Sequence, residues 1–356
     1  MLDLSNDLTI NVIKVFLLGF LGFVLAFLLT PFLTNFLYKY KLWKKKVKQK
    51  AIDGGELSVF KKFHSKREIS VPRFGGILIW AVTLLLALIF WLLSLTDIWW
   101  FEKLNFVSRG QTWLPLFALG VASLLGLVDD ILQVSTKKRY FVEGLPLKFR
   151  LFFVSCIGLI GGWWFYARLE WETIFVPGIG DIAIGFWLIP LFVLVMLAVY
   201  SGGVIDGLDG LSGGAFVSMF GAFAAIAFFR GQYDIAALCM VISGTILAFL
   251  WFNIPPARFY MGETGILGLT ATLTVIAFFT DSVLVLPIIG FLLVISSGSV
   301  ILQLLSKKFM RKKLFLAAPL HHHFQAKGWP HYKITMRFWI IGAVMAIIGV
   351  AIRLLR

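Results

Sequence analysis

Ten long apolar segments dominate this chain and constrain its fold more than any other feature. Each is close to the roughly 20 residues that a helix needs to cross a hydrocarbon layer about 30 Å thick. Inside lipid, backbone amides must be paired within their own segment, which a helix achieves. The pattern therefore predicts an all-α integral membrane protein with ten transmembrane helices, at about 10–38, 74–98, 112–134, 147–168, 182–201, 206–230, 234–252, 264–280, 284–306 and 334–355.

The composition supports a membrane protein and argues against a nucleic-acid-binding one. Hydrophobic residues make up 60% of the chain and charged residues only 14%, too few charges for a water-soluble surface. The net charge of +15 comes from basic residues clustered between the apolar segments, where they would contact anionic lipid headgroups. The expected partner is thus a lipid bilayer and not nucleic acid. Cys156 and Cys239 lie in apolar segments without metal-site spacing, which favours small buried residues.

The distribution of Lys and Arg predicts the orientation of the chain. The loop after the first segment contains KYKLWKKKVKQK at 39–50, whereas the next loop has only Lys103 and Arg109. By the positive-inside rule the first of these loops is cytoplasmic, and ten spans then place both termini on the extracytoplasmic side. Without internal repeats, residues 1–356 are predicted to form a single membrane domain. Its cytoplasmic loops are expected at about 39–73, 130–150, 200–208, 252–265 and 307–333.

Asp129 and Asp130 end the third apolar segment at the predicted cytoplasmic face. Adjacent carboxylates repel each other and resist the loss of water unless a cation or a substrate compensates their charge. This favours a functional role. The alternative is a solvated helix end that is neutralised by Lys137 and Lys138.

A second pair of acids, Asp206 and Asp209, opens the sixth segment in the sequence IDGLDGLSGG. The predicted helix begins at 206, so these acids lie three residues apart on one helical face, which the surrounding glycines leave bare. Capping of the helix N-terminus would explain Asp206 but explains Asp209 less well. Close helix packing is an alternative reason for the glycines.

Two further clusters lie in the predicted cytoplasmic loops. The sequence FNIPPARFYMGETG places Asn253, Tyr260 and Glu263 at the start of the eighth segment, where Glu263 could also be an ordinary first-turn acid. The last loop contains APLHHHFQAKGW with three consecutive histidines, 321–323. Consecutive histidines on a helix cannot all face one metal ion, so contact with phosphate or proton transfer is favoured over metal binding, and a solvated loop is the alternative.

All four clusters fall on the side that the Lys and Arg pattern assigns to the cytoplasm. Acids that can hold Mg²⁺, cations that can hold phosphates and an apolar surround for a lipid are the components of phosphoryl transfer at a membrane. The sequence therefore predicts a magnesium-dependent enzyme whose substrates carry phosphate groups.

The four clusters resemble the motifs of a known family. VDD at 128–130, DGLDGL at 206–211, FYMGETG at 259–265 and PLHHHFQAKGW at 319–329 are similar to those of the polyprenyl-phosphate N-acetylhexosamine-1-phosphate transferases. The histidine segment and RFW at 337–339 resemble the phospho-N-acetylmuramoyl-pentapeptide transferase branch. The resemblance implies a bacterial cytoplasmic (inner) membrane enzyme with its active site on the cytoplasmic side. The expected substrates are UDP-N-acetylmuramoyl-pentapeptide and undecaprenyl phosphate, and the expected products are UMP and lipid I. The expected cofactor is Mg²⁺. A homodimer is compatible with the family.

The resemblance also assigns roles to individual residues. Asp129 and Asp130 are expected to act on the lipid phosphate, either as a base or as a nucleophile, and His322 and His323 are the other expected catalytic residues. Glu263, with Asp129, is expected to bind Mg²⁺. Substrate-binding roles fall on Lys66, Lys148, Asp206, Asp209, Asn253, Tyr260 and His321.

The sequence departs from the family pattern at three places, which leave alternatives open. Glu263 stands where the family has aspartate, and Tyr200 and Gly203 stand where it has the two asparagines of NxxN. VPRFGG at 71–76 resembles the branch that transfers N-acetylglucosamine phosphate, so this donor is an alternative. A secondary transporter is a second alternative, although its coupling acids would be expected near the bilayer midplane and its sequence would show repeats.

Overall fold

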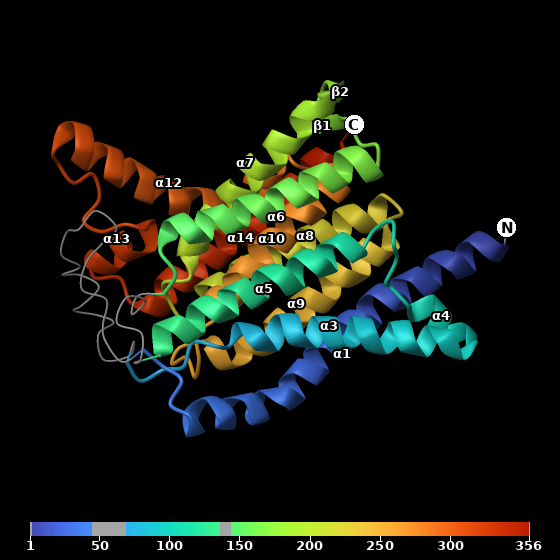
Figure 1. Cartoon of the computed structure of the whole chain (residues 1–356), viewed down its shortest axis with the longest axis horizontal. Helices are drawn as coiled ribbons and strands as arrows, with labels where there is room; N and C mark the ends of the chain where they lie inside the picture. The colour runs from blue at the N-terminus through green and yellow to red at the C-terminus, as the bar shows by residue number, and fades with distance from the viewer. Residues whose placement is uncertain (1, 45–68, 136–143, 356) are drawn as a thin grey trace.

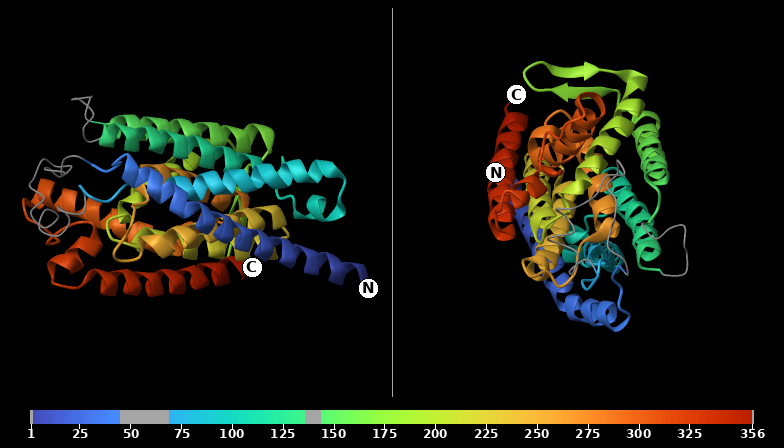
Figure 2. Two further views of the ribbon diagram at one scale, coloured as in Figure 1. Left: turned by 90° about the horizontal axis from the view of Figure 1, so that it is seen from below. Right: turned by 90° about the vertical axis from the view of Figure 1, so that its left-hand side faces the viewer.

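The computed structural model describes residues 2–44, 69–135 and 144–355. Among these residues, ten helices are long and apolar enough to cross a membrane, which confirms the predicted class and number of spans. The helices pack side by side as a bundle, with the start of α1 and the end of α14 at the same end (Figures 1 and 2). The short helix α13 lies at the opposite end (Figure 1). Which end faces the cytoplasm stays a prediction.

The spanning helices follow the apolar segments closely. Their bounds are α1 Leu2–Lys39, α3 Gly76–Leu93, α5 Trp113–Val134, α6 Leu147–Arg168, α7 Leu188–Ser201, α8 Leu211–Phe229, α9 Tyr233–Asn253, α10 Gly262–Phe279, α12 Phe291–Leu305 and α14 His331–Leu354. Shorter elements lie at their ends: η1 Ser94–Thr96, α4 Trp99–Leu104, η2 Gly185–Trp187, η3 Gly202–Ile205, α11 Leu286–Ile289, the π-turn η4 Ser306–Met310 and α13 Leu320–Ala326.

A short β-hairpin, which the sequence does not predict, precedes α7. Strands β1 Thr173–Val176 and β2 Gly180–Ala183 pair antiparallel, with Thr173 opposite Ala183. Gly178 and Gly180 turn the chain between them with φ angles of +80° and +102°, which glycine adopts without a steric penalty. The predicted span at 182–201 therefore begins later, at Leu188.

The start of α8 also differs from the prediction, and this changes the setting of two acids. Asp206 and Asp209 lie in a turn between η3 and α8, so the prediction that they share one helical face is wrong. The reason is Gly210, whose φ of +77° is left-handed and cannot continue a right-handed helix. The helix begins only at Leu211, after this glycine.

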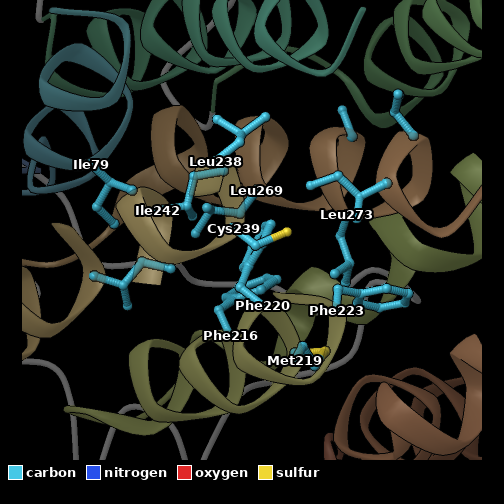
Figure 3. Close-up of a cluster of buried hydrophobic side chains, with 14 of the residues drawn as sticks. Ile79, Phe216, Met219, Phe220, Phe223, Leu238, Cys239, Ile242, Leu269 and Leu273 are labelled. Atoms are coloured by element: carbon cyan, nitrogen blue, oxygen red, sulfur yellow. The ribbon is translucent and has the colours of Figure 1, made fainter. Parts of the chain in front are cut away.

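Helix α10 lies at the centre of the bundle, and nearly all of its residues are buried. Apolar side chains from α3, α8, α9 and α10 pack together beside it (Figure 3), including Ile79, Phe216, Met219, Phe220, Phe223, Leu238, Cys239, Ile242, Leu269 and Leu273. Close packing of this kind leaves little room for a helix to shift. The position of the first turn of α10 is therefore well defined by the interior of the bundle.

Glycines allow two other helices to approach the start of α10 very closely. A Cβ atom added at Gly126 of α5 would lie 2.2 Å from the carbonyl oxygen of Glu263. One added at Gly76, the first residue of α3, would lie 2.4 Å from the backbone nitrogen of Gly265. Both positions exclude any side chain, since real Cβ atoms do not approach other atoms so closely.

The segment VPRFGG runs alongside FYMGETG and pairs with it through the backbone. Gly75 N–H donates to the Tyr260 carbonyl and Gly76 N–H to the Met261 carbonyl, each at 2.8 Å. In return Tyr260 N–H donates to the Pro72 carbonyl at 2.8 Å. The two glycines of VPRFGG are thus explained by packing and pairing around the start of α10.

Replacement of Gly126 by alanine tests the close contact between α5 and α10. The new methyl group must displace the Glu263 carbonyl, so we expect Gly126→Ala to lower the free energy of unfolding by about 1–3 kcal/mol. Thermal unfolding of the purified protein in detergent measures this effect.

Gly120→Ala is the matched control for this variant on the same helix. A Cβ added there would meet only Leu84 Cδ1, at an ordinary distance of 3.5 Å. This change should leave stability unchanged or raise it by up to about 1 kcal/mol through helix propensity. Equal destabilisation by the two variants would contradict the packing argument.

Candidate active site

Asp130 caps the N-terminus of α10. The first amides of a helix have no partner inside the helix and must find one outside it. The Asp130 carboxylate, which is fully buried, accepts the N–H of Glu263 at 3.2 Å through Oδ1 and the N–H of Thr264 at 2.9 Å through Oδ2. Arg73 Nε lies 3.7 Å from Oδ1. The positive end of the helix dipole and this guanidinium together stabilise the negative charge.

Asp129 faces a different set of donors, although it is the neighbour of Asp130. Its Oδ2 accepts Gln133 Nε2 at 2.7 Å, and its Oδ1 accepts the backbone N–H of Leu145. Arg150 Nη1 lies 4.0 Å from Oδ2. Successive side chains on a helix point about 100° apart, so each carboxylate has its own partners and their mutual repulsion is compensated.

Arg150 joins Asp129 to Glu263. Its Nη1 forms an ion pair with Glu263 Oε1 at 2.7 Å, and its Nε donates to the Leu145 carbonyl at 3.0 Å. The Tyr200 phenol lies beside the guanidinium and interacts with it. Site prediction from the sequence missed Arg150, although one signal was available. A positive charge in the first turn of an apolar helix such as α6 opposes the helix dipole unless carboxylates lie nearby.

The arrangement of Glu263 and Asp129 does not fit the predicted Mg²⁺ site. Arg150 contacts both carboxylates, whereas Mg²⁺ needs a near-octahedral set of oxygen ligands. In the part of the chain that the structure describes, the cation between these two acids is the guanidinium of Arg150.

Asp206 and Asp209 connect the turn before α8 to its neighbours. Asp206 is half-buried; its Oδ1 accepts the Ser212 hydroxyl at 2.7 Å, and its carboxylate faces the backbone amide of Gly262. Burial raises the pKa of Asp206, while the Ser212 hydroxyl and Arg73 act in the opposite direction. Asp209 is buried, and its Oδ2 accepts the N–H of Ala257 at 3.1 Å.

Asn253 clamps the same turn to FYMGETG. The buried amide accepts the N–H of Gly210 at 2.9 Å and donates from Nδ2 to the Phe259 carbonyl at 2.7 Å. Both ends of the side chain are therefore engaged by backbone groups, which supports a positioning role. Tyr260 is half-buried beside it and lies in the backbone pairing with VPRFGG.

The three histidines lie on the short helix α13 and point to different places. His321 is fully buried against the turn before α8, where a Cβ added at Gly207 would lie 2.3 Å from its Nε2. The Nε2 of His322 would lie 3.0 Å from the same added atom, and its Nδ1 lies 3.0 Å from Gln325 Oε1. These two histidines therefore border the turn that carries Asp206.

His323 bonds instead to the segment before α13. Its Nδ1 accepts the backbone N–H of Leu316 at 3.1 Å, which requires this nitrogen to be unprotonated. Burial, and then the nearby Lys327, lower the pKa of His323. The structure thus places His321 and His322 beside the turn that carries Asp206, whereas His323 is bonded to the Leu316 backbone.

The structure describes only one of the two lysines expected to bind phosphate. Lys66 lies outside the described residues, and Lys148 is exposed at the start of α6. Among the described residues, the cations paired with Asp129, Asp130 and Glu263 are Arg73 and Arg150.

Comparison with known proteins finds relatives along nearly the whole chain. Residues 112–281 match the model of glycosyl transferase family 4. The chain is 34% identical to the phospho-N-acetylmuramoyl-pentapeptide-transferase of Anoxybacillus flavithermus over 93% of this chain and 95% of that protein. It is 30% identical to the protein of the same name from Chloroflexus aurantiacus, over 96% of this chain and 90% of that protein. A third relative of the same name, from Bacillus licheniformis, is 34% identical over 93% of this chain and 95% of that protein.

Replacement of Asn253 by alanine distinguishes a clamp from a substrate contact. The Gly210 N–H and the Phe259 carbonyl would lose their partners, so we expect the variant to be destabilised by about 1–3 kcal/mol for each group. The midpoint of thermal unfolding in detergent measures this loss. Leu247→Ala, on an exposed position of α9, is the control and should change the midpoint little. Unchanged stability with only a raised KM would contradict the clamp.

The raised pKa of Asp206 predicts a pH-dependent difference between the wild type and Asp206→Asn. A raised folded-state pKa contributes stability below the unfolded value, and this contribution is lost as pH rises through the folded pKa. Asparagine carries no charge at any of these pH values and can still accept the Ser212 hydroxyl. Relative to the wild type, Asp206→Asn should therefore gain stability as pH rises from about 4, the unfolded-state value for aspartate, to neutral pH.

Unfolding midpoints across this pH range are the measurement, with Asp97→Asn as the control. Asp97 is exposed, and the change removes the same charge outside the site. A difference between Asp206→Asn and the wild type that is constant across the range would show that the carboxylate is not held in an unfavourable environment.

Proposed function

Because this chain belongs to the family of phospho-N-acetylmuramoyl-pentapeptide transferases, we propose that it transfers phospho-N-acetylmuramoyl-pentapeptide from its UDP-activated donor to undecaprenyl phosphate. The products would be UMP and lipid I, the first lipid-linked precursor of peptidoglycan. The observation that carries the proposal is that relatives with this activity in their names match over more than nine-tenths of the chain.

The contacts among the four motifs support the same proposal. Asp130 accepts amides from the start of FYMGETG, Asp206 faces the amide of Gly262, and Gly207 of the same turn packs against His321. Motifs that are far apart in the sequence therefore form one continuous cluster at the end of the bundle. Such a cluster can position two phosphate-bearing substrates against each other.

The reaction would exchange one phosphoanhydride bond for another. An oxygen of the lipid phosphate attacks the β-phosphorus of the donor and forms a new P–O bond. The bond from this phosphorus to the bridging oxygen breaks, and UMP leaves with the electron pair. Catalysis of this kind consists mainly of positioning and of electrostatic stabilisation.

We assign the residues according to how each is held. Asp130 positions the start of α10, since both of its oxygens accept backbone amides. Asp129 is held by Gln133, by the Leu145 amide and by Arg150, and is assigned the role toward the lipid phosphate. His322, half-buried beside the Asp206 turn, is assigned contact with phosphate or transfer of a proton. Mg²⁺ dependence stays a prediction.

The proposed location is the bacterial cytoplasmic membrane, with this cluster on the cytoplasmic side. The ten apolar helices make the chain a multi-pass membrane protein. The loops expected to be cytoplasmic from their Lys and Arg content carry the clustered motifs, and the positive-inside rule then places the cluster inside the cell.

The alternative donor, UDP-N-acetylglucosamine, rests on the segment VPRFGG. Gly75, Gly76 and Pro72 of this segment are explained by backbone pairing with FYMGETG, and Arg73 contacts Asp130. These contacts give the segment a structural reason, so it does not by itself favour the N-acetylglucosamine donor, and the muramoyl-pentapeptide donor is the one we propose.

An assay of UMP release tests both the reaction and the donor. Purified protein in detergent with undecaprenyl phosphate and Mg²⁺ should release UMP from UDP-N-acetylmuramoyl-pentapeptide but not from UDP-N-acetylglucosamine. Glu263→Ala, which frees Arg150 from its partner, should lower kcat by about a hundredfold because misplaced groups at a reacting centre have effects of that size.

Glu102→Ala, an exposed acid on α4, is the control and should leave the rate unchanged. UMP from the N-acetylglucosamine donor alone would overturn the proposed donor. No UMP from either donor would overturn the transferase proposal itself.

A further inference from the structure

The residues at two of the departures from the family pattern meet at one guanidinium. Glu263, in place of the family's aspartate, pairs with Arg150 at 2.7 Å. Tyr200, in place of an asparagine of NxxN, lies beside the same guanidinium. The positions are on α10 and α7, and Arg150 is on α6. Both of the residues that depart from the resembled pattern therefore lie against the same side chain.

Arg150 is held from several directions. The Leu145 carbonyl accepts its Nε at 3.0 Å, Glu263 Oε1 pairs with Nη1 at 2.7 Å, and Asp129 Oδ2 lies 4.0 Å from the same nitrogen. The side chains of Arg150 and Glu263 are each only 20% exposed. A guanidinium is planar and keeps its charge, so partners arranged in this way hold it more firmly than a lysine could be held.

A divalent cation cannot join this arrangement without disturbing it. Mg²⁺ binds oxygens at about 2.0–2.1 Å and demands near-octahedral geometry. Coordination by Glu263 would bring the metal ion next to Arg150, and the repulsion between the two positive charges would be large in partly buried surroundings. Glutamate is one methylene longer than aspartate, which allows the carboxylate to extend from the start of α10 to Arg150 on α6.

We infer that Arg150 takes the place of a divalent cation between Glu263 and Asp129 in this chain. Among the described residues, the Arg150 guanidinium is the cation that pairs with both acids. A divalent cation binds there only weakly, because it must displace Arg150 from Glu263. This inference concerns binding alone and does not require the proposed transfer reaction.

Binding of Mn²⁺ to the full-length protein in detergent, without substrates, tests the inference. Electron paramagnetic resonance of free Mn²⁺ reports the affinity. Arg150→Gln removes the competing charge but keeps a polar side chain, so Mn²⁺ should bind about tenfold more tightly than to the wild type. Lys148→Gln removes the same charge from an exposed position two residues earlier and should leave the affinity unchanged.

A second variant keeps the test independent of whether Arg150→Gln folds. Glu263→Asp retains the carboxylate but shortens its arm, which weakens the contact with Arg150, so it too should raise the affinity for Mn²⁺. Adding Glu263→Gln to Arg150→Gln should abolish the gain, since the ligand is then lost.

Two results would overturn the inference. One is Mn²⁺ binding to Arg150→Gln and Glu263→Asp that is no tighter than to the wild type. The other is a gain that persists in the double variant, because the ion would then bind elsewhere. Neither result bears on UMP release, which is measured separately.

Discussion

The N-terminus of α10 is the constraint on which the rest of the site depends. This helix is buried along nearly its whole length, so its first amides cannot be satisfied by bulk water. Asp130 of α5 accepts two of these amides, those of Glu263 and Thr264, and the carboxylate of Asp206 faces a third amide, that of Gly262. Two distant acidic motifs are thus brought to one point because a helix start in the interior of a membrane protein requires acceptors.

Small residues allow the neighbouring helices to reach the N-terminus of α10. Gly76 and Gly126 allow α3 and α5 to approach the first turn of α10 more closely than any side chain would permit, and Asn253 joins the turn before α8 to the same segment. Acids that are costly to bury therefore lie within a tightly packed frame that supplies their hydrogen bonds. The charges can be concentrated there because the packing and the hydrogen bonds, rather than water, stabilise them.

The predicted spans were accurate where the physical signal is local to the chain. A segment that faces lipid must be apolar over about 20 residues, and this property can be read from consecutive residues alone. The prediction failed where a single backbone angle decides at which residue a helix begins. Because of Gly210, α8 begins later in the sequence than predicted, and because of a hairpin turn, α7 does so too. The candidate site shows the same division, since the acids and histidines were identified from motifs but their individual partners were not.

The sequence by itself determined the membrane class, the ten spans and the family, because hydropathy and motifs are properties of contiguous residues. Only the tertiary structure decided that Arg150, rather than the exposed Lys148, pairs with Glu263, that Asp130 caps α10 while Asp129 faces α6, and that His323 bonds to the Leu316 backbone. The reason is that Arg150 and Glu263 lie 113 residues apart. Whether such groups meet depends on the packing of helices between them, which no local pattern records.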